Sequence, residues 1–201
     1  MALSSCLILG AVGRANGQGL SVDATLPIPA VEVDGKGNLV IKASAMSSRS
    51  DFDFLVGNWK LTNRKLKCRL HGCTEWTPPF ESFVEMQRVL GGSGNIDKYH
   101  QNVDGKPFDG LAVRLFDPAT RLWSIYWADG SRGTFDPPVV GSFENSVGHF
   151  FGRDTFEGRD VIVVFRWDVR NPQRPVWSQA FSVDQGKSWE WNSINVSETI
   201  P

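Results

Sequence analysis

The sequence predicts an all-β protein in which antiparallel strands run up and down and close into a barrel behind an irregular N-terminal extension. Apolar and polar residues alternate over short segments spaced roughly 10–15 residues apart, as in half-buried strands. Turn-forming residues separate these segments, and helical periodicity is weak along the whole chain. A long antiparallel meander commonly closes on itself, because closure removes the unpaired strand edges.

The first fifty residues differ in composition from the rest of the chain. Residues 1–50 contain no Trp and no Phe, and they are rich in Gly, Ala and Ser. The apolar run Leu7–Val12 resembles the core of a signal peptide, but the basic residue that normally precedes such a run is missing, since Arg14 follows it. Residues 1–15 are therefore ambiguous as an export signal. A secreted or periplasmic location and a cytoplasmic one are equally compatible with the chain.

The remainder of the extension predicts a small hairpin and a linker. Residues 31–43 form two alternating arms around a turn at residues 34–38. The Ser-rich stretch 44–50 is typical of a linker. We therefore expect an N-terminal extension at 1–50 and a barrel domain at 51–201.

Nine strands are expected in the barrel domain. The turn Asp117–Thr120 joins two of them in a hairpin, and residues 145–147 and 184–187 join two further pairs. The expected strands lie at 57–67, 80–90, 110–117, 121–129, 138–145, 148–158, 159–169, 175–184 and 188–196.

A glycine and a tryptophan mark the entry to the first strand. Gly57 allows a tight backbone bend as the chain enters the strand. Trp59 then points inward and plugs the closed end of the barrel. Both residues are expected to be structural.

Six segments stand in an order that resembles an uncharacterised bacterial family of small lipocalin-like (calycin-type) β-barrel proteins. The resemblance covers about residues 51–192 and implies a calycin-type barrel without an assigned ligand. One departure is that no Arg or Lys follows Trp189, whereas calycin-like proteins often carry a basic residue on the last strand that stacks on the inward tryptophan. Either another group covers Trp59, or the last strand is truncated or divergent. The six segments are DFDFLVGNWKL, LGGSGNIDKY, GLAVRLFDPATRLWSIYW, FDPPVVGSFENSVGHFFGRDTFEGR, VVFRWD and WSQAFSVDQGKSWEWN.

Several polar residues alternate with apolar ones and are candidates for ligand binding in the barrel interior. Arg114 shares a face with Ala112 and Phe116, so it could grip a ligand carboxylate or phosphate, or point outward into a cross-strand ion pair. Trp127 shares an apolar face with Trp123 and is expected to line the interior.

Further candidates come from the second half of the chain. Asp154 lies on a face with aromatic rings, where it could act as an acid or base or pair with a nearby Arg. Arg166 and Gln179 alternate with apolar residues, and either would need a partner if buried. His149, on the same expected strand as Asp154, is the second weak catalytic candidate.

The Gly-rich stretch at 91–97 is expected to form a loop at the barrel mouth. Asn95 and Asp97 lie in it and are further ligand-binding candidates. Its spacing does not match a nucleotide-binding glycine motif, and no strand–helix–strand unit surrounds it.

No metal or cofactor is expected. Cys68 and Cys73 flank His71, and three interpretations stay open: a local disulfide, a three-ligand metal site and two reduced thiols. The three-ligand site is the weakest, because it lacks a second pair of ligands. Haem-binding barrels of this general type use a late histidine, and none follows His149.

The leading functional hypothesis is a barrel that binds a small, mostly apolar or aromatic molecule in its interior. The alternatives are a small-molecule enzyme (isomerase, cyclase or hydrolase) with an enclosed pocket, and a filled barrel that serves as an interaction module. A net charge of −1 without a basic patch argues against nucleic acid. No segment is expected to span a membrane, and a homodimer is compatible with the sequence. Asn195-Val196-Ser197 also matches a glycosylation motif.

Overall fold

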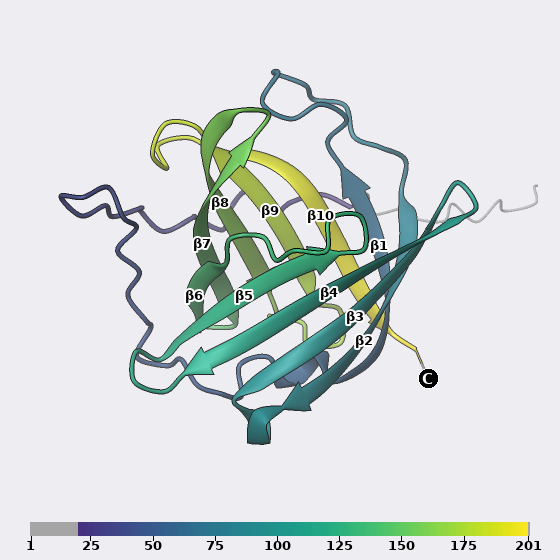
Figure 1. Cartoon of the computed structure of the whole chain (residues 1–201), viewed down its shortest axis with the longest axis horizontal. Helices are drawn as coiled ribbons and strands as arrows, with labels where there is room; N and C mark the ends of the chain where they lie inside the picture. Colours follow the sequence, from purple (N-terminus) through teal and green to yellow (C-terminus); the bar gives the residue numbers. More distant parts are fainter. Residues whose placement is uncertain (1–19, 201) are drawn as a thin grey trace, which may run out of the picture.

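A closed antiparallel barrel of ten strands forms the body of the protein, as shown by a computed structural model that describes residues 20–200 (Figure 1). Each strand pairs with the next along the chain, and the last strand pairs with the first. The prediction of an up-and-down antiparallel barrel is therefore confirmed. The signal expectation for residues 1–15 lies outside the described residues. Within the described residues, no helix is long and apolar enough to cross a membrane.

The only helical elements described are two short 3-10 turns, η1 (Asp53–Leu55) and η2 (Leu90–Gly92). The strands are β1 (Gly57–Lys65), β2 (Phe80–Val89), β3 (Gly94–Val103), β4 (Lys106–Asp117), β5 (Leu122–Asp129), β6 (Val139–Glu144), β7 (Val147–Phe156), β8 (Arg159–Asp168), β9 (Val176–Ser182) and β10 (Glu190–Thr199).

Strand β3 is the element that the sequence pattern missed. Its residues were expected partly as a loop at the mouth, because glycines precede it and its inward positions are polar. In the structure β3 pairs along its length with β2 and β4, and Asn95 and Asp97 lie opposite Arg114 and Ala112 of β4. The placement of Asn95 and Asp97 in a mouth loop was therefore wrong: both are buried strand residues.

One end of the barrel is closed by η1 and the residues on either side of it. Phe52 is 1% exposed, and Trp59 is buried and donates its indole N–H to the carbonyl oxygen of Leu55 at 2.8 Å. Gly57 has φ +116°, a backbone conformation that residues with a side chain rarely adopt. This bend turns the chain from η1 into β1. The ring of Phe52 lies within 5.0–6.2 Å, centroid to centroid, of the rings of Phe54, Trp123, Phe143, Phe150 and Trp167.

The N-terminal extension covers part of the outer face of the barrel. Val33 and Leu39 form an isolated antiparallel bridge within it. Its apolar side chains pack against a second core on the outside of the sheet, so this part of the sheet is buried on both faces. The contributors from the extension are Ile28, Val31, Leu39 and Ile41, and those from the barrel are Phe151, Ile162, Val164, Ala180, Trp189 and Trp191.

The expected linker at 44–50 is held firmly against the barrel. Arg121 donates to the carbonyl oxygen of Ser47 at 2.6 Å, and the indole N–H of Trp123 donates to that of Ser48 at 3.0 Å. Ser47 is itself 1% exposed. The segment therefore connects the extension to the closed end through fixed contacts.

His149 lies on this outer face, beneath the extension and away from the interior. Its ring stacks near that of Phe151 with 6.5 Å between centroids. Its Nε2 is buried without a hydrogen-bond partner in the described part of the chain. Burial, with a smaller contribution from the positive charge of Arg166, lowers the pKa of His149 from 6.5 to about 4.

This depressed pKa predicts a stability loss on acidification that depends on His149. Between about pH 6.5 and pH 4 the unfolded chain binds a proton that the folded chain excludes, so stability is full above this window and falls within it. Urea unfolding at pH 7 and pH 4 is expected to show wild type losing about 2–3 kcal/mol more than His149→Gln. Equal losses in the two proteins would contradict a buried, neutral His149.

Candidate functional site

The barrel encloses a cavity of about 490 Å³ that opens at the end opposite η1. Its volume lies within the range of small-molecule pockets. Aromatic rings form much of its wall. The ring-bearing residues that line it are Trp59, Tyr99, Phe108, Trp127, Phe156, Phe165, Trp167, Trp177 and Phe181.

Trp127, a ligand-binding candidate from the sequence, forms one side of this cavity. Tyr99 and Phe108 hold its position: the centroid of the Tyr99 ring lies 5.5 Å from that of Trp127 in a T-shaped contact, and Phe108 packs edge-on against Tyr99. A Cβ at Gly110 would collide with the Trp127 ring, so the indole lies directly over that glycine. Burial raises the pKa of Tyr99, which favours its neutral phenol in this apolar setting.

A seam of neutral polar side chains runs along the adjoining wall. Asn63 of β1 donates to Ser82 of β2 at 2.8 Å and to two backbone carbonyls. On β10, Ser193, Asn195 and Ser197 all face the cavity. The side-chain oxygen of Asn195 is buried and accepts no hydrogen bond from any described residue.

These seam residues were not identified from the sequence. Asn195 was noticed only as part of a glycosylation motif, yet it is 8% exposed and faces inward, where no glycan could be attached in the folded barrel. The alternation of Ser193, Asn195 and Ser197 along one strand was the available signal. Because polar residues on an alternating face normally indicate solvent exposure, these three residues were not recognised as lining the cavity.

Arg114 and Asp97 form a buried ion pair near the closed end. Both terminal nitrogens of Arg114 donate to the carboxylate of Asp97, at 2.7 and 2.6 Å, and one of them also donates to Asn95 at 2.9 Å. The two side chains are 4% and 9% exposed. The guanidinium also lies over the ring of Phe52, 5.0 Å from its centroid.

This geometry changes the expected role of Arg114. The prediction that it faces the interior agrees with its position in the cavity wall. However, its terminal nitrogens are already committed to Asp97 and Asn95, and only its buried Nε has no partner among the described residues. A bidentate grip on a ligand anion would require this pair to break, so Arg114 and Asp97 serve primarily to neutralise each other.

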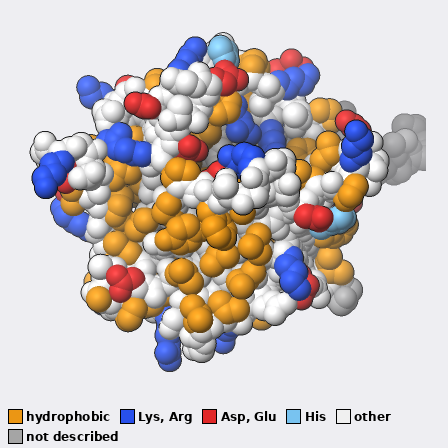
Figure 2. Space-filling model, viewed as in Figure 1, with side chains coloured by type: hydrophobic (Ala, Val, Ile, Leu, Met, Phe, Trp, Pro, Cys, Tyr) orange, Lys and Arg blue, Asp and Glu red, His pale blue; other side chains and the backbone are white. Residues whose placement is uncertain are grey.

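The mouth of the cavity carries charged side chains. Arg132 pairs with Asp136 at 2.7 Å and with Asp129 at 3.4 Å. Asp154 lines the mouth but is exposed, and its carboxylate accepts from the backbone N–H of Thr155 at 2.7 Å. Figure 2 shows charged side chains around a hollow, beside an apolar area on the barrel wall. Because it lines the cavity and is exposed, Asp154 lies at the entrance, outside the apolar interior.

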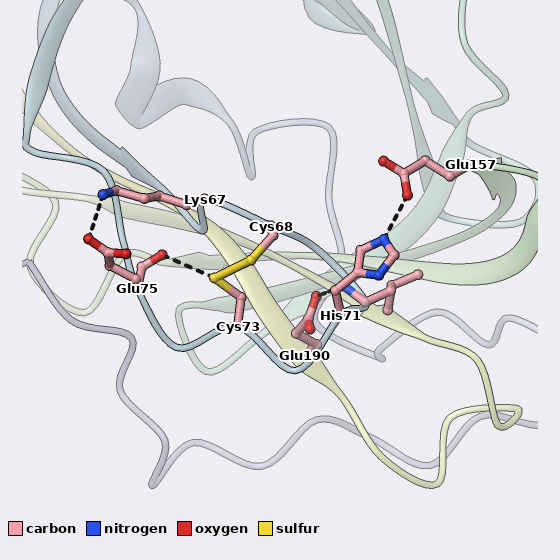
Figure 3. The surroundings of a disulfide bond; sticks show 8 residues. Lys67, Cys68, His71, Cys73, Glu75, Glu157 and Glu190 are labelled. Atoms are coloured by element: carbon pink, nitrogen blue, oxygen red, sulfur yellow. Dashed lines mark hydrogen bonds and ion pairs between the residues drawn. A yellow bond between two sulfur atoms is a disulfide. The ribbon is translucent and has the colours of Figure 1, made fainter.

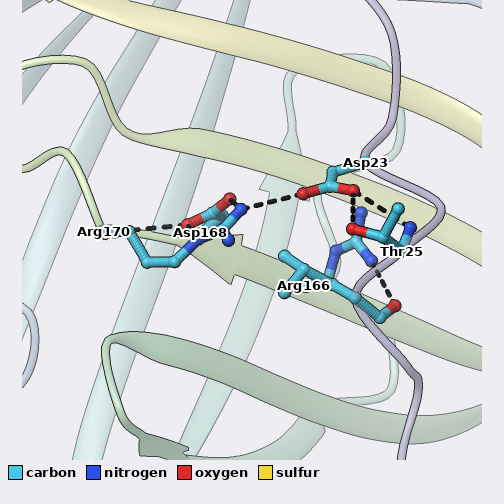
Figure 4. A network of polar contacts seen from close by, with 6 residues as sticks. Asp23, Thr25, Arg166, Asp168 and Arg170 are labelled. Atoms are coloured by element: carbon cyan, nitrogen blue, oxygen red, sulfur yellow. Dashed lines mark hydrogen bonds and ion pairs between the residues drawn. The ribbon is translucent and has the colours of Figure 1, made fainter.

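Gln179 and Arg166, on neighbouring strands, lie on opposite faces of the sheet. Gln179 lines the cavity and donates to Asn192 at 2.8 Å. Arg166 faces the outside of the barrel, where its guanidinium lies 4.3 Å from the ring centroid of Trp191 and donates to the backbone carbonyl of Leu26. Figure 4 shows Arg166 beside Asp23 and Thr25 of the extension. The placement of Arg166 in the interior was therefore wrong, because the extension covers this face and satisfies the arginine there.

Cys68 and Cys73 form a disulfide in the loop between β1 and β2, with 5.6 Å between their Cα atoms (Figure 3). His71, which lies between them, contacts the carboxylate of Glu157 at 2.9 Å. Among residues 20–200 no group of three or more His, Cys, Asp or Glu side chains could hold a metal ion. Of the three interpretations left open by the sequence, the structure shows the local disulfide.

The buried ion pair predicts a large, asymmetric effect on stability. Asp97→Ala leaves the Arg114 charge buried without its counterion and is expected to cost about 3–5 kcal/mol in urea unfolding. Replacing both, as Asp97→Ala with Arg114→Leu, should cost less than Asp97→Ala alone.

The control is Asp109→Ala, which removes an exposed carboxylate from β4 and should change stability by less than about 0.5 kcal/mol. An Asp97→Ala cost as small as that of the control would show that the pair is not desolvated.

Comparison with known proteins gives the fold. No protein-family model matches the chain, and no curated protein matches it. The structure is similar to that of the S-type phycobiliprotein lyase CPES from Guillardia theta, with a TM-score of 0.54 and 11% identity, covering 78% of this chain and 94% of that one. It is also similar to Rv2717c from M. tuberculosis, with a TM-score of 0.46 and 14% identity, covering 75% and 98% of the two chains. At 11% identity the likeness to the CPES structure shows the fold alone, a closed lipocalin-like barrel.

Proposed function

We propose that the protein binds a small, mostly apolar or aromatic molecule inside the barrel. The observation that carries this proposal is the cavity of about 490 Å³ walled by aromatic rings. Rings on opposite walls can contact both faces of a flat ligand, and burial of apolar surface supplies the main driving force. A volume of this size argues against the alternative of a barrel filled by its own side chains.

Polar groups in the wall would orient the ligand. The side-chain oxygen of Asn195 lacks a donor among the described residues, and a buried acceptor without a partner is costly. A ligand N–H or O–H would satisfy it. Gln179 and Ser193 lie nearby in register and offer further hydrogen-bonding groups.

The enzymatic alternative has no specific observation in its favour. Of the two weak catalytic candidates, His149 lies on the outer face of the sheet, beside Phe151, and Asp154 is exposed at the mouth. The likeness to a phycobiliprotein lyase supports the fold on which the binding proposal rests, and it brings no reaction or ligand to this chain.

The proposal is tested by filling the cavity. Ala112 of β4 is 6% exposed and lines the cavity, so Ala112→Phe places a ring inside it. N-phenyl-1-naphthylamine is expected to bind wild type with enhanced dye fluorescence and quenching of cavity tryptophans. Ala112→Phe should weaken binding at least about tenfold, because the added ring occupies ligand volume.

The matched control is Val113→Phe, which adds a ring of the same kind to the next residue of β4, on the outer face. This variant should bind the dye as wild type does. Binding that is absent in wild type, or equal in all three proteins, would contradict an interior site.

A further inference from the structure

Lys65 and Arg69 are two positive side chains at the cavity mouth without a carboxylate partner among the described residues. Lys65 ends β1 and Arg69 lies in the disulfide loop that follows it, and both line the cavity. Neither forms an ion pair within 4.0 Å with any residue in the described range 20–200. They also border a second, open depression beside the disulfide loop.

Arg69 is held against aromatic rings. Its guanidinium carbon lies 5.8 Å from the ring centroid of Phe156 and 5.9 Å from that of Phe181, and both rings line the cavity. Burial lowers the pKa of Arg69, and the negative charge of Glu190 opposes this effect. That carboxylate is already engaged, since it accepts the backbone N–H of Leu70 at 2.7 Å.

Lys65 brings a second charge to the same place. Its ammonium lies 5.7 Å from the ring centroid of Phe80. Desolvation, and secondly the positive charge of Arg69, lower the pKa of Lys65. The lowering by Arg69 indicates that the two cations are close enough to repel each other.

The other charges at the mouth are arranged differently. Arg132 is neutralised by Asp129 and Asp136. Arg153 donates to the carboxamide of Gln185 at 3.1 Å. Asp154 is the one carboxylate at the mouth whose hydrogen bond, among the described residues, comes from a backbone N–H, that of Thr155. Among the described residues, Lys65 and Arg69 are therefore the mouth cations whose side chains have neither a carboxylate nor a hydrogen-bond partner, and both lie beside aromatic rings.

We infer that the ligand is an amphipathic organic acid whose anionic head lies between Lys65 and Arg69 while its apolar body extends among the cavity rings. This inference rests on the proposed function, since it names the chemical class of molecule for the same cavity. An anionic head would relieve the repulsion between the two cations and accept charge-assisted hydrogen bonds from both. Arg69 is half-buried, which strengthens its contact with an anion relative to a contact on an open surface.

Two dyes that share one apolar body test the inference. 8-Anilinonaphthalene-1-sulfonate carries an anionic group, and N-phenyl-1-naphthylamine has the same aromatic framework without it. Lys65→Gln with Arg69→Gln is expected to raise the Kd of the anionic dye at least about tenfold and that of the neutral dye by less than about twofold. In wild type, only the anionic dye should bind more weakly as salt is raised.

Lys67→Gln is the matched control. Lys67 is two residues from each cation, but its side chain pairs with Glu75 and does not line the cavity. This variant should bind both dyes as wild type does. Circular dichroism and thermal unfolding verify that the double variant is folded, and Lys65→Arg with Arg69→Lys should retain affinity for the anionic dye.

The outcomes separate the two proposals. If both dyes bind wild type and the double variant weakens them equally or not at all, the head-group site is overturned and the apolar cavity remains. If neither dye binds wild type, the proposed function fails and the inference fails with it. An equal effect of Lys67→Gln on the anionic dye would show only a general effect of surface charge and would also overturn the site.

Discussion

Phe52 and the buried Arg114–Asp97 pair close one end of the barrel, and the cavity exists because they seal that end. The Phe52 ring fills the centre of that end and contacts rings from several strands, while the Arg114 guanidinium lies over its face. Burying a charge there is tolerable only because Asp97 and Asn95 bind both terminal nitrogens. Because these groups close its base, the barrel keeps an open volume above them that is reachable from the opposite end. The cation that stacks on a ring at this end comes from β4 and lies over Phe52.

The two faces of the sheet pack against different parts of the structure. Because side chains alternate along a strand, each residue lies on one face or the other. Inward positions form the closed end, the aromatic cavity wall and the polar seam of β10. Outward positions of β7 to β10 form a second apolar core, and the N-terminal extension covers it. Arg166 and His149 belong to this outer layer, where Arg166 also lies near the ion-pair network of Asp23, Asp168 and Arg170. The described part of the extension is thus a part of the folded structure.

Much of the fold was predictable from the sequence, since nine of the ten strands follow from alternation and turn residues, and Gly57 with Trp59 marks the first of them. Strand β3 was missed because three glycines precede or begin it and its inward residues are polar. The faces of β8 could not be distinguished, because Val161, Ile162, Val163 and Val164 are all apolar and all buried. For this reason Arg166 was predicted on the interior face, although it lies on the outer one. Arg114, Trp127 and Gln179 were placed inward by their neighbours, but the polar seam on β10 depends on the closure of β10 against β1, which no local pattern reveals.

In the proposed function, an apolar molecule enters the barrel and binds in the cavity lined by aromatic rings. A crystal structure of the protein soaked with N-phenyl-1-naphthylamine tests it most directly, because it locates the dye as well as detecting it. We expect electron density for the dye inside the barrel, in contact with Trp127 and Phe181, with the Arg114–Asp97 pair intact beneath it. Side chains that fill the interior, or dye found only on the apolar outer wall of the barrel, would contradict it.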